Sequence, residues 1–368
     1  MTPLPDRYCP VDGIRIPGDS LAWCCPSCHG PLDLDFAPTP APLKSLTGRV
    51  NSLWRYAETL PLSAPRVSLG EGRTPLVELT DEVRGKLDFL MPTLSFKDRG
   101  AVMLAELALR AGPRRVVADS SGNAGTAVAA YCARARLPCT VYVPLGASVK
   151  KLEQMEAHGA RLEVVDGDRE AAATAARRAA DEPDTFYASH VYNPYFLHGT
   201  KTYVHELWED LGGRLPEVLV LPVGNGTLLL GAALAVAELY GAGLLDRRPR
   251  LWAVQAAAVA PLAHAFAEGA DDLTGTTTLS PTHAEGIAVP RPPRARQILR
   301  AVRESGGTFL TVTEDRIRHA QLDLASRGLY VESTGVVCWA AVREGALGGR
   351  SAVVPLCGAG LKSGLARD

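Results

Sequence analysis

The residue best suited to covalent chemistry in this sequence is a lysine, Lys97. Only seven of the 39 basic residues are lysines, and the others are arginines. Lys97 follows apolar Leu94 and Phe96, and an apolar setting lowers the pKa of an amine and makes it nucleophilic. A surface lysine whose stem lies along apolar neighbours fits the same spacing. The local pattern therefore indicates nucleophilic catalysis but leaves a structural alternative open.

A second group of polar residues forms the run Ser120-Ser121-Gly122-Asn123. The run follows an expected strand over residues 115–119 and opens an expected helix over 124–135. Its small residues let backbone N–H groups approach an anion at the helix N-terminus, and Asn123 adds a side-chain amide. A tight turn with a serine cap is the alternative.

A third loop, Gly224-Asn225-Gly226-Thr227, lies between an expected strand over 218–223 and an apolar helix over 228–240. The N-terminus of that helix would favour a phosphate group. The next glycine, Gly231, comes two positions too late for the dinucleotide-binding pattern, and no P-loop lysine follows. The loop therefore predicts a phosphate site that fits neither a dehydrogenase nor a nucleotidase.

Near the C-terminus, Cys357 stands where the expected strand 352–356 ends and turns on Gly358 and Gly360. This position places a thiol at the carboxyl end of a strand, beside the other loops. A buried cysteine that only fills space is the alternative.

These loops need a scaffold that brings the ends of several strands together. From Arg114 onward, short apolar runs alternate with Ala-rich helical patterns, which predicts an α/β fold of parallel sheets with helices on both faces. The expected strands are 115–119, 139–144, 162–166, 185–189, 218–223, 251–255 and 352–356. The expected helices are 124–135, 149–158, 169–181, 199–211, 228–240 and 314–327. Ligands of such sheets bind beyond the carboxyl ends of the strands, where the loops lie.

Length, composition and charge limit the kinds of molecule that this protein is expected to bind. The 368 residues suit two domains and a small appendage. A net charge of -1 offers no global basic surface for nucleic acid or anionic membrane. No apolar run reaches the roughly 18 residues of a membrane span, and the N-terminus lacks a signal-peptide pattern. We therefore expect a cytoplasmic protein that acts on a small molecule.

The first 36 residues hold a group of metal-ligating side chains. Cys9 and Asp12 form one pair, and Cys25 and Cys28 form a second with the C-x-x-C spacing. A Cys3Asp zinc site fits this set, with Cys24 or His29 as substitutes, although a decayed remnant is the alternative. Five acids and two bases give this segment a charge of -3 (2 - 5), which argues against a nucleic-acid-binding module.

Taken in order, the motifs resemble the threonine synthase branch of fold-type II enzymes that use pyridoxal 5'-phosphate (PLP). The resemblance spans most of the chain and implies an α/β fold of two doubly wound, mainly parallel-sheet domains. It also relates the N-terminal segment to a zinc ribbon. The motifs that carry it are Gly70–Leu76, Ser95–Gly100, Ser121–Asn123, Asn193–Tyr195, Gly199–Thr202, Gly224–Thr227 and Val331–Glu332.

The resemblance implies a role for each of these residues. Lys97 would hold the cofactor as a Schiff base and move the proton at the substrate Cα. Asn123 would contact the cofactor's 3'-hydroxyl, and Gly224–Thr227 would hold its phosphate. Cys357 would face the pyridine nitrogen, and a thiol there leaves the ring nearer neutral, which suits elimination and replacement chemistry.

For the substrate, the resemblance implies that O-phosphohomoserine and water are converted to threonine and phosphate. Ala124 and Gly125 stand where the family has hydroxyls, and Phe196 stands where it often has an arginine. Losing such a charge-assisted phosphate contact would cost about 1.5 to 3 kcal/mol. The alternative is a serine or threonine dehydratase, or another β-elimination or β-replacement enzyme acting on a small amino acid.

If the substrate phosphate is bound, other donors must hold it. The nearest candidates in the motifs are Ser120, Ser121, Thr200 and Lys201. The domains implied are an appendage over 1–36, a large PLP-binding domain over 37–97 and 206–368, and a small α/β domain over 98–205. The family further implies a homodimer.

Overall fold

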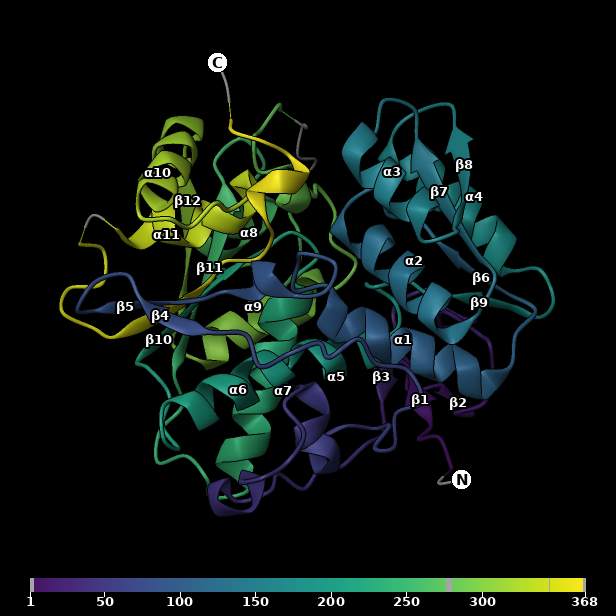
Figure 1. The fold of residues 1–368 in the computed structure, drawn as a ribbon, viewed down its shortest axis with the longest axis horizontal. Helices are drawn as coiled ribbons and strands as arrows, with labels where there is room; N and C mark the ends of the chain where they lie inside the picture. Colours follow the sequence, from purple (N-terminus) through teal and green to yellow (C-terminus); the bar gives the residue numbers. More distant parts are fainter. Residues whose placement is uncertain (1–2, 276–279, 344, 367–368) are drawn as a thin grey trace. The chain divides into compact units, whose positions relative to one another are not determined.

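The computed structural model describes residues 3–275, 280–343 and 345–366, which form two compact units (Figure 1). Unit 1 consists of the chain up to Ala41, Ser45–Gly72 and Lys97–Thr200. Unit 2 consists of Pro42–Lys44, Arg73–Phe96 and the chain from Lys201 onward. Each unit contains a parallel sheet with helices, so the predicted α/β class is confirmed. Among the described residues, no helix combines the length and apolar character needed to cross a membrane.

The main sheet of unit 1 has four parallel strands in the order β8-β7-β6-β9. Its strands are β6 (Arg115–Ala118), β7 (Cys139–Pro144), β8 (Arg161–Val165) and β9 (Thr185–Tyr187). Its helices are α1 (Asp98–Ala111), α2 (Asn123–Ala135), α3 (Val149–Ala157), α4 (Arg169–Ala180) and α5 (Pro194–Thr200). Right-handed crossovers place α2 and α3 on one face and α4 on the other.

The order of these strands creates a switch point between β6 and β9. The chain runs outward from β6 through β7 to β8, and then crosses back to β9 on the far side of β6. The loops that leave β6 and β9 therefore diverge at the carboxyl ends of neighbouring strands, where open α/β sheets bind their ligands. The loop after β6 carries the predicted Ser120–Asn123 run.

The N-terminal residues of unit 1 form a small three-stranded antiparallel sheet with the order β2-β1-β3. Its strands are β1 (Arg7–Tyr8), β2 (Arg15–Ile16) and β3 (Asp33–Leu34). We call residues 3–36 the N-terminal ribbon. Its own core consists of only four buried residues, namely Cys9, Ile16, Cys25 and Leu32. An apolar core of that size does not hold a fold together without further support.

Unit 2 contains a six-stranded sheet with the order β12-β11-β10-β13-β5-β4, parallel except for β4. Its strands are β4 (Leu76–Glu78), β5 (Val83–Lys86), β10 (Val218–Pro222), β11 (Arg250–Ala256), β12 (Thr308–Val312) and β13 (Ala352–Pro355). Its helices are α6 (Thr202–Asp210), α7 (Thr227–Gly241), α8 (Pro261–Ala267), α9 (Ala295–Glu304), α10 (Glu314–Ser326) and α11 (Val337–Val342). Every residue of β10 is buried, as expected for a central strand covered on both faces.

Unit 2 has its own switch point, between β10 and β13. The chain moves from β10 through β11 to β12 and returns to β13 on the other side of β10. The loop after β10 is the glycine run that begins at Gly224, and the loop after β13 begins with Leu356 and Cys357. Two separate motifs of the sequence analysis thus leave neighbouring strands at one sheet edge.

All seven expected strands are present, with bounds within about two residues of those predicted. The expected helix 199–211 is two helices, because α5 ends at Thr200 and α6 begins at Thr202. Several elements were not predicted, among them β5, whose Lys86 is charged yet wholly buried. The segment Ser45–Gly72 packs with unit 1. Glu71 of this segment accepts hydrogen bonds from Trp54 of the same segment and from buried Tyr131 of α2.

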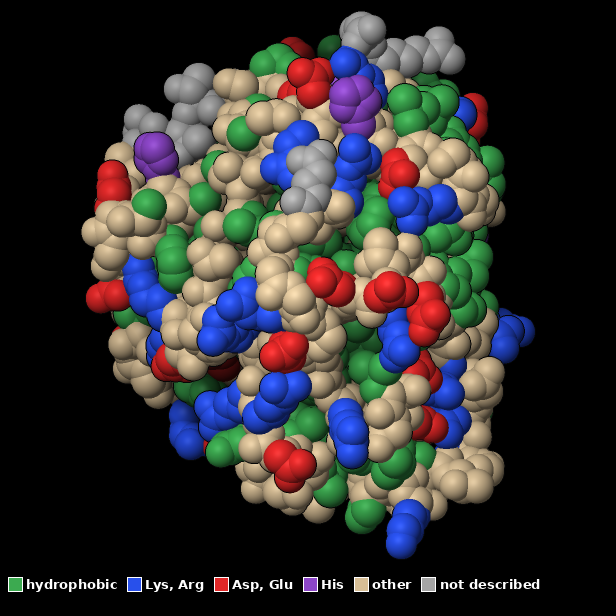
Figure 2. Space-filling view, turned by 90° about the vertical axis from the view of Figure 1, so that its left-hand side faces the viewer, with side chains coloured by type: hydrophobic (Ala, Val, Ile, Leu, Met, Phe, Trp, Pro, Cys, Tyr) green, Lys and Arg blue, Asp and Glu red, His purple; other side chains and the backbone are tan. Residues whose placement is uncertain are grey.

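Charges of both signs are interspersed on the face drawn in Figure 2, where Lys and Arg lie among Asp and Glu. That face presents no extended surface of a single sign.

Candidate functional site

Lys97 stands at the start of α1 in unit 1, where it is the residue that precedes the first helical turn. It is half-buried, and its Nζ lies 5.8 Å from the ring centroid of Phe196 on α5. Two glycines permit this approach of the helices. A Cβ at Gly100 would come within 2.4 Å of the Phe196 ring, and one at Gly199 within 2.0 Å of the Arg99 carbonyl oxygen. The sequence thus fixes an aromatic ring beside the lysine.

His190 is a second neighbour of Lys97, and the sequence analysis missed it. His190 follows the end of β9 by three residues and Ser120 follows the end of β6 by two, so both belong to loops that leave neighbouring strands. Its ring meets Phe196 edge-on at 5.8 Å. Burial, followed by the positive charges of Lys97 and Arg169, lowers the pKa of His190 well below its ordinary value. The imidazole is therefore neutral near pH 7. A histidine just beyond an expected strand was the signal that could have revealed it.

The Ser120–Asn123 loop leads directly into α2, whose first residue is Asn123. Gly122 is the N-cap residue and, as a glycine, has no side chain that could cap the helix. The N-terminus of the helix carries a partial positive charge that favours an anion. Gly125 has a packing reason, because a Cβ there would lie 1.8 Å from the Ser120 carbonyl oxygen. The hydroxyl that the family often carries near this point is excluded by the fold of this loop.

In unit 2, the glycine loop that begins at Gly224 leads directly into helix α7, as the Ser120–Asn123 loop leads into α2. Gly226 precedes the helix with a left-handed backbone (φ 72°), and no described side chain caps the N-terminus. A Cβ at Gly226 would approach Ile298 to 2.3 Å, and one at Gly224 would approach Ile287 to 2.8 Å. Both positions therefore require glycine, and the turn leads into a helix N-terminus whose partial positive charge favours an anion.

Cys357 follows the end of β13 by two residues, beside the loop that leaves the neighbouring parallel strand β10 at Val223. Its side chain is only 2% exposed, and its backbone carbonyl accepts a hydrogen bond from Phe96 N at 2.9 Å. Ser95, whose hydroxyl is buried without a hydrogen-bond partner in the described part of the chain, bridges to Gly358. The residue after Phe96 is Lys97. The two residues that precede Lys97, Ser95 and Phe96, are thus held against the Cys357 loop.

Two of the residues predicted to bind substrate form hydrogen bonds or ion pairs with other residues of the protein. Lys201 is wholly buried, and its Nζ lies 2.7 Å from Glu238 Oε1, while His205 Nε2 lies 3.3 Å from Oε2 of the same carboxylate. Glu238 comes eleven residues (238 - 227) after the start of α7, which is about 16 Å along the helix. Thr200 donates its hydroxyl to the Leu197 carbonyl at 3.0 Å. A substrate role for either residue stays a prediction.

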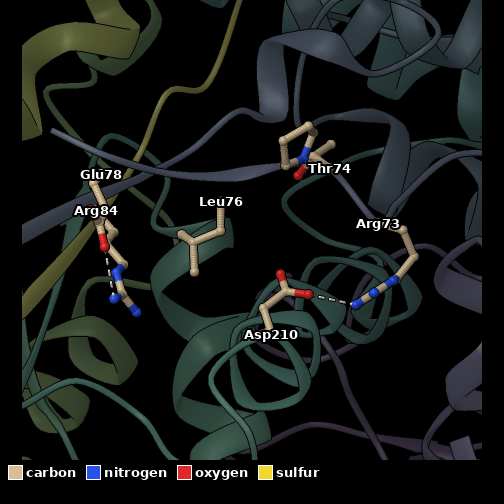
Figure 3. A pocket seen from close by; sticks show the side chains of 7 residues that line it. Arg73, Thr74, Leu76, Glu78, Arg84 and Asp210 are labelled. Atoms are coloured by element: carbon tan, nitrogen blue, oxygen red, sulfur yellow. Dashed lines mark hydrogen bonds and ion pairs between the residues drawn. The ribbon is translucent and has the colours of Figure 1, made fainter. Parts of the chain in front are cut away.

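Unit 2 also has an open polar pocket of about 380 Å³, which contains none of the predicted site residues (Figure 3). Its charged side chains are already paired. Arg73 Nη1 lies 2.8 Å from Asp210 Oδ1, and Arg84 Nη2 lies 3.2 Å from Glu78 Oε1. The pocket therefore offers no strong charge to a ligand.

The N-terminal ribbon brings together the predicted metal ligands Cys9, Asp12, Cys25 and Cys28. Their ligand atoms all lie within 4.8 Å of one another, with Cys9 and Cys28 Sγ 3.5 Å apart. Two zinc-bound sulfur atoms in tetrahedral geometry would be about 3.8 Å apart. Burial raises the pKa of Cys9 to about 12, so without a cation this thiol is neutral. The donor set and its spacing fit a tetrahedral metal ion.

Two loops of matching conformation hold these ligands. In the first, Val11 N donates to Cys9 Sγ at 3.4 Å and Gly13 N donates to Cys9 O at 3.0 Å. In the second, Ser27 N and His29 N donate to the sulfur and carbonyl of Cys25 at the same distances. His29 occupies the left-handed turn position of Gly13 and lies outside the ligand group, as does Cys24.

The two switch points, together with Lys97, which precedes both in the sequence, define a class of PLP-binding α/β proteins. Residues 67–358 match the family described as pyridoxal-phosphate dependent enzymes, and the chain belongs to this family. It is 32% identical to the threonine synthase of Methanosarcina acetivorans, covering 90% of this chain and 84% of that one. It is 34% identical to the threonine synthase of Mycobacterium leprae, covering 83% and 87%. Among solved structures, a threonine deaminase from T.th. is similar, with a TM-score of 0.68, 27% identity and coverage of 78% and 92%.

The residues present fit this cofactor. The helices α2 and α7 both begin after a glycine with no described side chain at the cap, which suits the oxygen-rich groups of an anionic ligand. The buried Ser95 hydroxyl and Cys357 supply uncharged polar atoms at the second switch point. Lys97 remains half-exposed, as a lysine that reacts with an incoming aldehyde must be.

Proposed function

We propose that this protein is a PLP-dependent lyase of the threonine synthase type, which converts O-phosphohomoserine and water to threonine and phosphate. The similarity to threonine synthases over most of the chain is the observation that carries this function. Lys97, with Asn123 and the Gly224–Thr227 loop, would bind the cofactor. These roles are supported by the half-exposed lysine and by the two uncapped helix N-termini at switch points.

When bound, PLP supplies an electron sink that stabilises negative charge at the substrate Cα. The residues of the chain supply the rest. The Lys97 amine would hold the cofactor and would carry the proton to and from Cα. The N-terminus of α7 would hold the phosphate of the cofactor. Cys357 would offer the ring nitrogen an uncharged thiol in place of a carboxylate, which would keep the ring nearer neutral.

For the substrate side, the position of Ser120 and Ser121 in the loop after β6, at the switch point of unit 1, supports them as hydroxyl donors to an incoming phosphate. Neutral His190, in the loop after the neighbouring strand β9, adds an N–H. Neither Phe196 nor His190 provides the fixed positive charge that a phosphate group favours. This is the specific reason to keep a serine or threonine dehydratase as the second candidate, and the similar fold of a threonine deaminase supports it as well.

A screen of the purified, PLP-loaded enzyme separates the two candidates. O-Phosphohomoserine, threonine, serine and O-acetylserine would each be supplied, and threonine, phosphate, ammonia and 2-oxo acids measured. We expect threonine and phosphate from O-phosphohomoserine in equal amounts. Efficient release of ammonia and a 2-oxo acid from threonine or serine, with no threonine from O-phosphohomoserine, would instead establish the dehydratase.

We also propose that the N-terminal ribbon holds one structural zinc ion through Cys9, Asp12, Cys25 and Cys28. Three thiolates and one carboxylate complete a closed tetrahedral site with no position left for catalysis. Metal analysis should find one zinc per chain, lost in the Cys25→Ser, Cys28→Ser double variant. Asp12→Cys offers a matched comparison, because a fourth thiolate should bind zinc more tightly in a chelator competition. A metal-free and fully active wild-type protein would refute the site.

A homodimer, which the family resemblance implies, and a cytoplasmic location, which the sequence pattern favours, stay part of this proposal. Sedimentation of the purified enzyme tests the dimer.

A further inference from the structure

The ribbon lies against the part of unit 1 that surrounds Lys97, although its cysteines are far from Lys97 in the sequence. Leu34 of β3 belongs to the same buried core as Tyr195 and Phe196 of α5. Phe36 meets His198 of α5 edge-on, with the ring centroids 5.6 Å apart. The ribbon is therefore packed onto the helix that presents Phe196 to Lys97.

Trp23 makes the most specific of these contacts. Its ring meets Tyr187 edge-on at 5.3 Å and Tyr192 edge-on at 5.1 Å. Its indole N–H donates to Asp181 Oδ1 at 2.9 Å. One side chain of the ribbon thus contacts the last residue of β9 and the loop that follows it. Such edge-on pairs fix ring orientation as well as burying apolar area.

The two tyrosines lead to both loops of the unit 1 switch point. The Tyr187 side chain lies close enough to Asp119, the residue before Ser120, for each to shift the pKa of the other. Tyr192 lies in the segment 188–196, where Ser189 Oγ accepts from Tyr192 N at 3.2 Å and Asn193 Oδ1 accepts from Tyr195 N at 3.1 Å. These bonds make the segment a defined turn. A displacement at Tyr192 would therefore reach His190 and Phe196.

Trp23 is itself held by the ribbon. It stands two residues before Cys25, the buried ligand of the proposed metal site. Buried Arg7 of β1 donates to the carbonyl of Ala22 at 2.7 Å, which holds the chain just before Trp23. The conformation of the ribbon thus sets the position of the indole ring.

We propose that Trp23 is a positioning residue for segment 188–196 beside Lys97, so that the state of the Cys9, Asp12, Cys25 and Cys28 loops is transmitted to the cofactor lysine. The proposal rests on the function proposed above for Lys97. It gives the ribbon a role in the active site, whereas sequence distance alone would confine it to stability.

The test compares Trp23→Ala, Trp23→Phe and Arg15→Ala in the full-length, PLP-loaded enzyme. Arg15 is an exposed ribbon residue that pairs with Asp35, so Arg15→Ala controls for a general change in the ribbon. The readouts are the visible absorption band of lysine-bound PLP, hydrogen exchange of segment 188–196, zinc content, and kcat and KM measured separately.

We expect Trp23→Ala to keep its zinc, to lose exchange protection in segment 188–196, to shift the visible band, and to lower kcat/KM about tenfold. Trp23→Phe should restore most of these values, and Arg15→Ala should not change them. In the Cys25→Ser, Cys28→Ser variant, the same band shift and loss of protection should accompany the loss of metal.

A wild-type enzyme without a PLP band would overturn the proposed function rather than this inference. A normal wild-type band, combined with an unchanged band, exchange pattern and kcat/KM in Trp23→Ala, would overturn the positioning role. Loss of thermal stability in Trp23→Ala with those three readouts unchanged would leave Trp23 as a structural contact only, which also contradicts the proposal.

Discussion

Two lysines of this chain lie in motifs that resemble one enzyme family, yet their surroundings are opposite. Lys97 is half-exposed and lies beside the rings of Phe196 and His190 in unit 1. Lys201 is wholly buried in unit 2 and bonds to Glu238, which also meets His205. The same residue type is therefore presented for reaction in one region and used to neutralise a buried carboxylate in the other.

The difference teaches that burial does not by itself identify a reactive lysine. A buried ion pair holds its ammonium in one geometry and makes it a poor nucleophile. Lys86 repeats the pattern, because it is wholly buried with Nζ 2.8 Å from Asp210 and 3.1 Å from Glu206. Among these three lysines, Lys97 alone combines partial exposure with a position next to a switch-point loop.

The largest effect should come from Lys97→Ala. If the proposed function holds, the change removes both the amine that holds PLP and the group that moves the Cα proton, and proton transfer by a positioned side chain alone contributes about 10² to 10⁴ in rate. We expect loss of the visible cofactor band and of measurable turnover, with unfolding behaviour like that of wild type. Borohydride reduction followed by peptide mapping should place PLP on Lys97. If PLP were found on Lys201 or Lys86 instead, a buried lysine of unit 2 would be the reactive one, and the assignment of Lys97 would be wrong.

Lys201→Ala should affect folding instead of substrate binding. Removing one partner of a buried ion pair leaves Glu238 uncompensated, at a cost of about 3 to 5 kcal/mol in the free energy of unfolding. Urea titration should show this loss, and the Lys201→Met, Glu238→Gln double variant should recover much of it. The KM for O-phosphohomoserine should change no more than the KM for a neutral substrate. A selective rise for the phosphorylated substrate would return Lys201 to the substrate site.

The sequence predicted the strands, the loops and Lys97 because each has a local signal. Gly224 and Gly226 mark their loop by composition, and the apolar run of β10 marks a central strand. The buried ion pair of Lys201 had no such signal, since its partner Glu238 is 37 residues away in sequence. His190 was missed for the related reason that only the pairing of β6 with β9 makes the loops that carry Ser120 and His190 neighbours. Contacts between distant segments decide these roles, and periodicity does not report them.

The contacts of Trp23 illustrate the same limit. Its partners Tyr187 and Tyr192 lie in a part of the chain that no ribbon motif indicates. Because the ribbon cysteines are far in sequence from every cofactor motif, sequence distance alone predicts that removal of residues 1–36 lowers stability or solubility more than turnover. The packing of the ribbon onto α5 instead favours an effect on both, and the Trp23 variants measure it.

The smallest predicted effect is a difference in pH dependence between the two histidines of these regions. The pKa of each is lowered in the folded protein, mainly by burial. Near His190 the charged groups are Lys97 and Arg169, which lower its pKa further, whereas His205 lies beside Glu238, which opposes the lowering. The unfolded chain therefore binds a proton first as pH falls below about 6.5. Stability should fall with pH by up to about 1.4 kcal/mol per unit for each group.

The loss of stability is absent at pH values above the pKa of histidine in the unfolded chain. It stops growing at the pH where the histidine of the folded protein also becomes protonated. His205 becomes protonated at a higher pH than His190. Urea unfolding at several pH values from about 7.5 to about 5.0, spanning the ordinary histidine pKa, should then show that His190→Gln removes more of the acid-side slope than His205→Gln. The two variants are matched in size and chemistry, so each serves as the control for the other. Equal slopes, or a larger effect at His205, would mean that the cationic surroundings of His190 do not persist in solution.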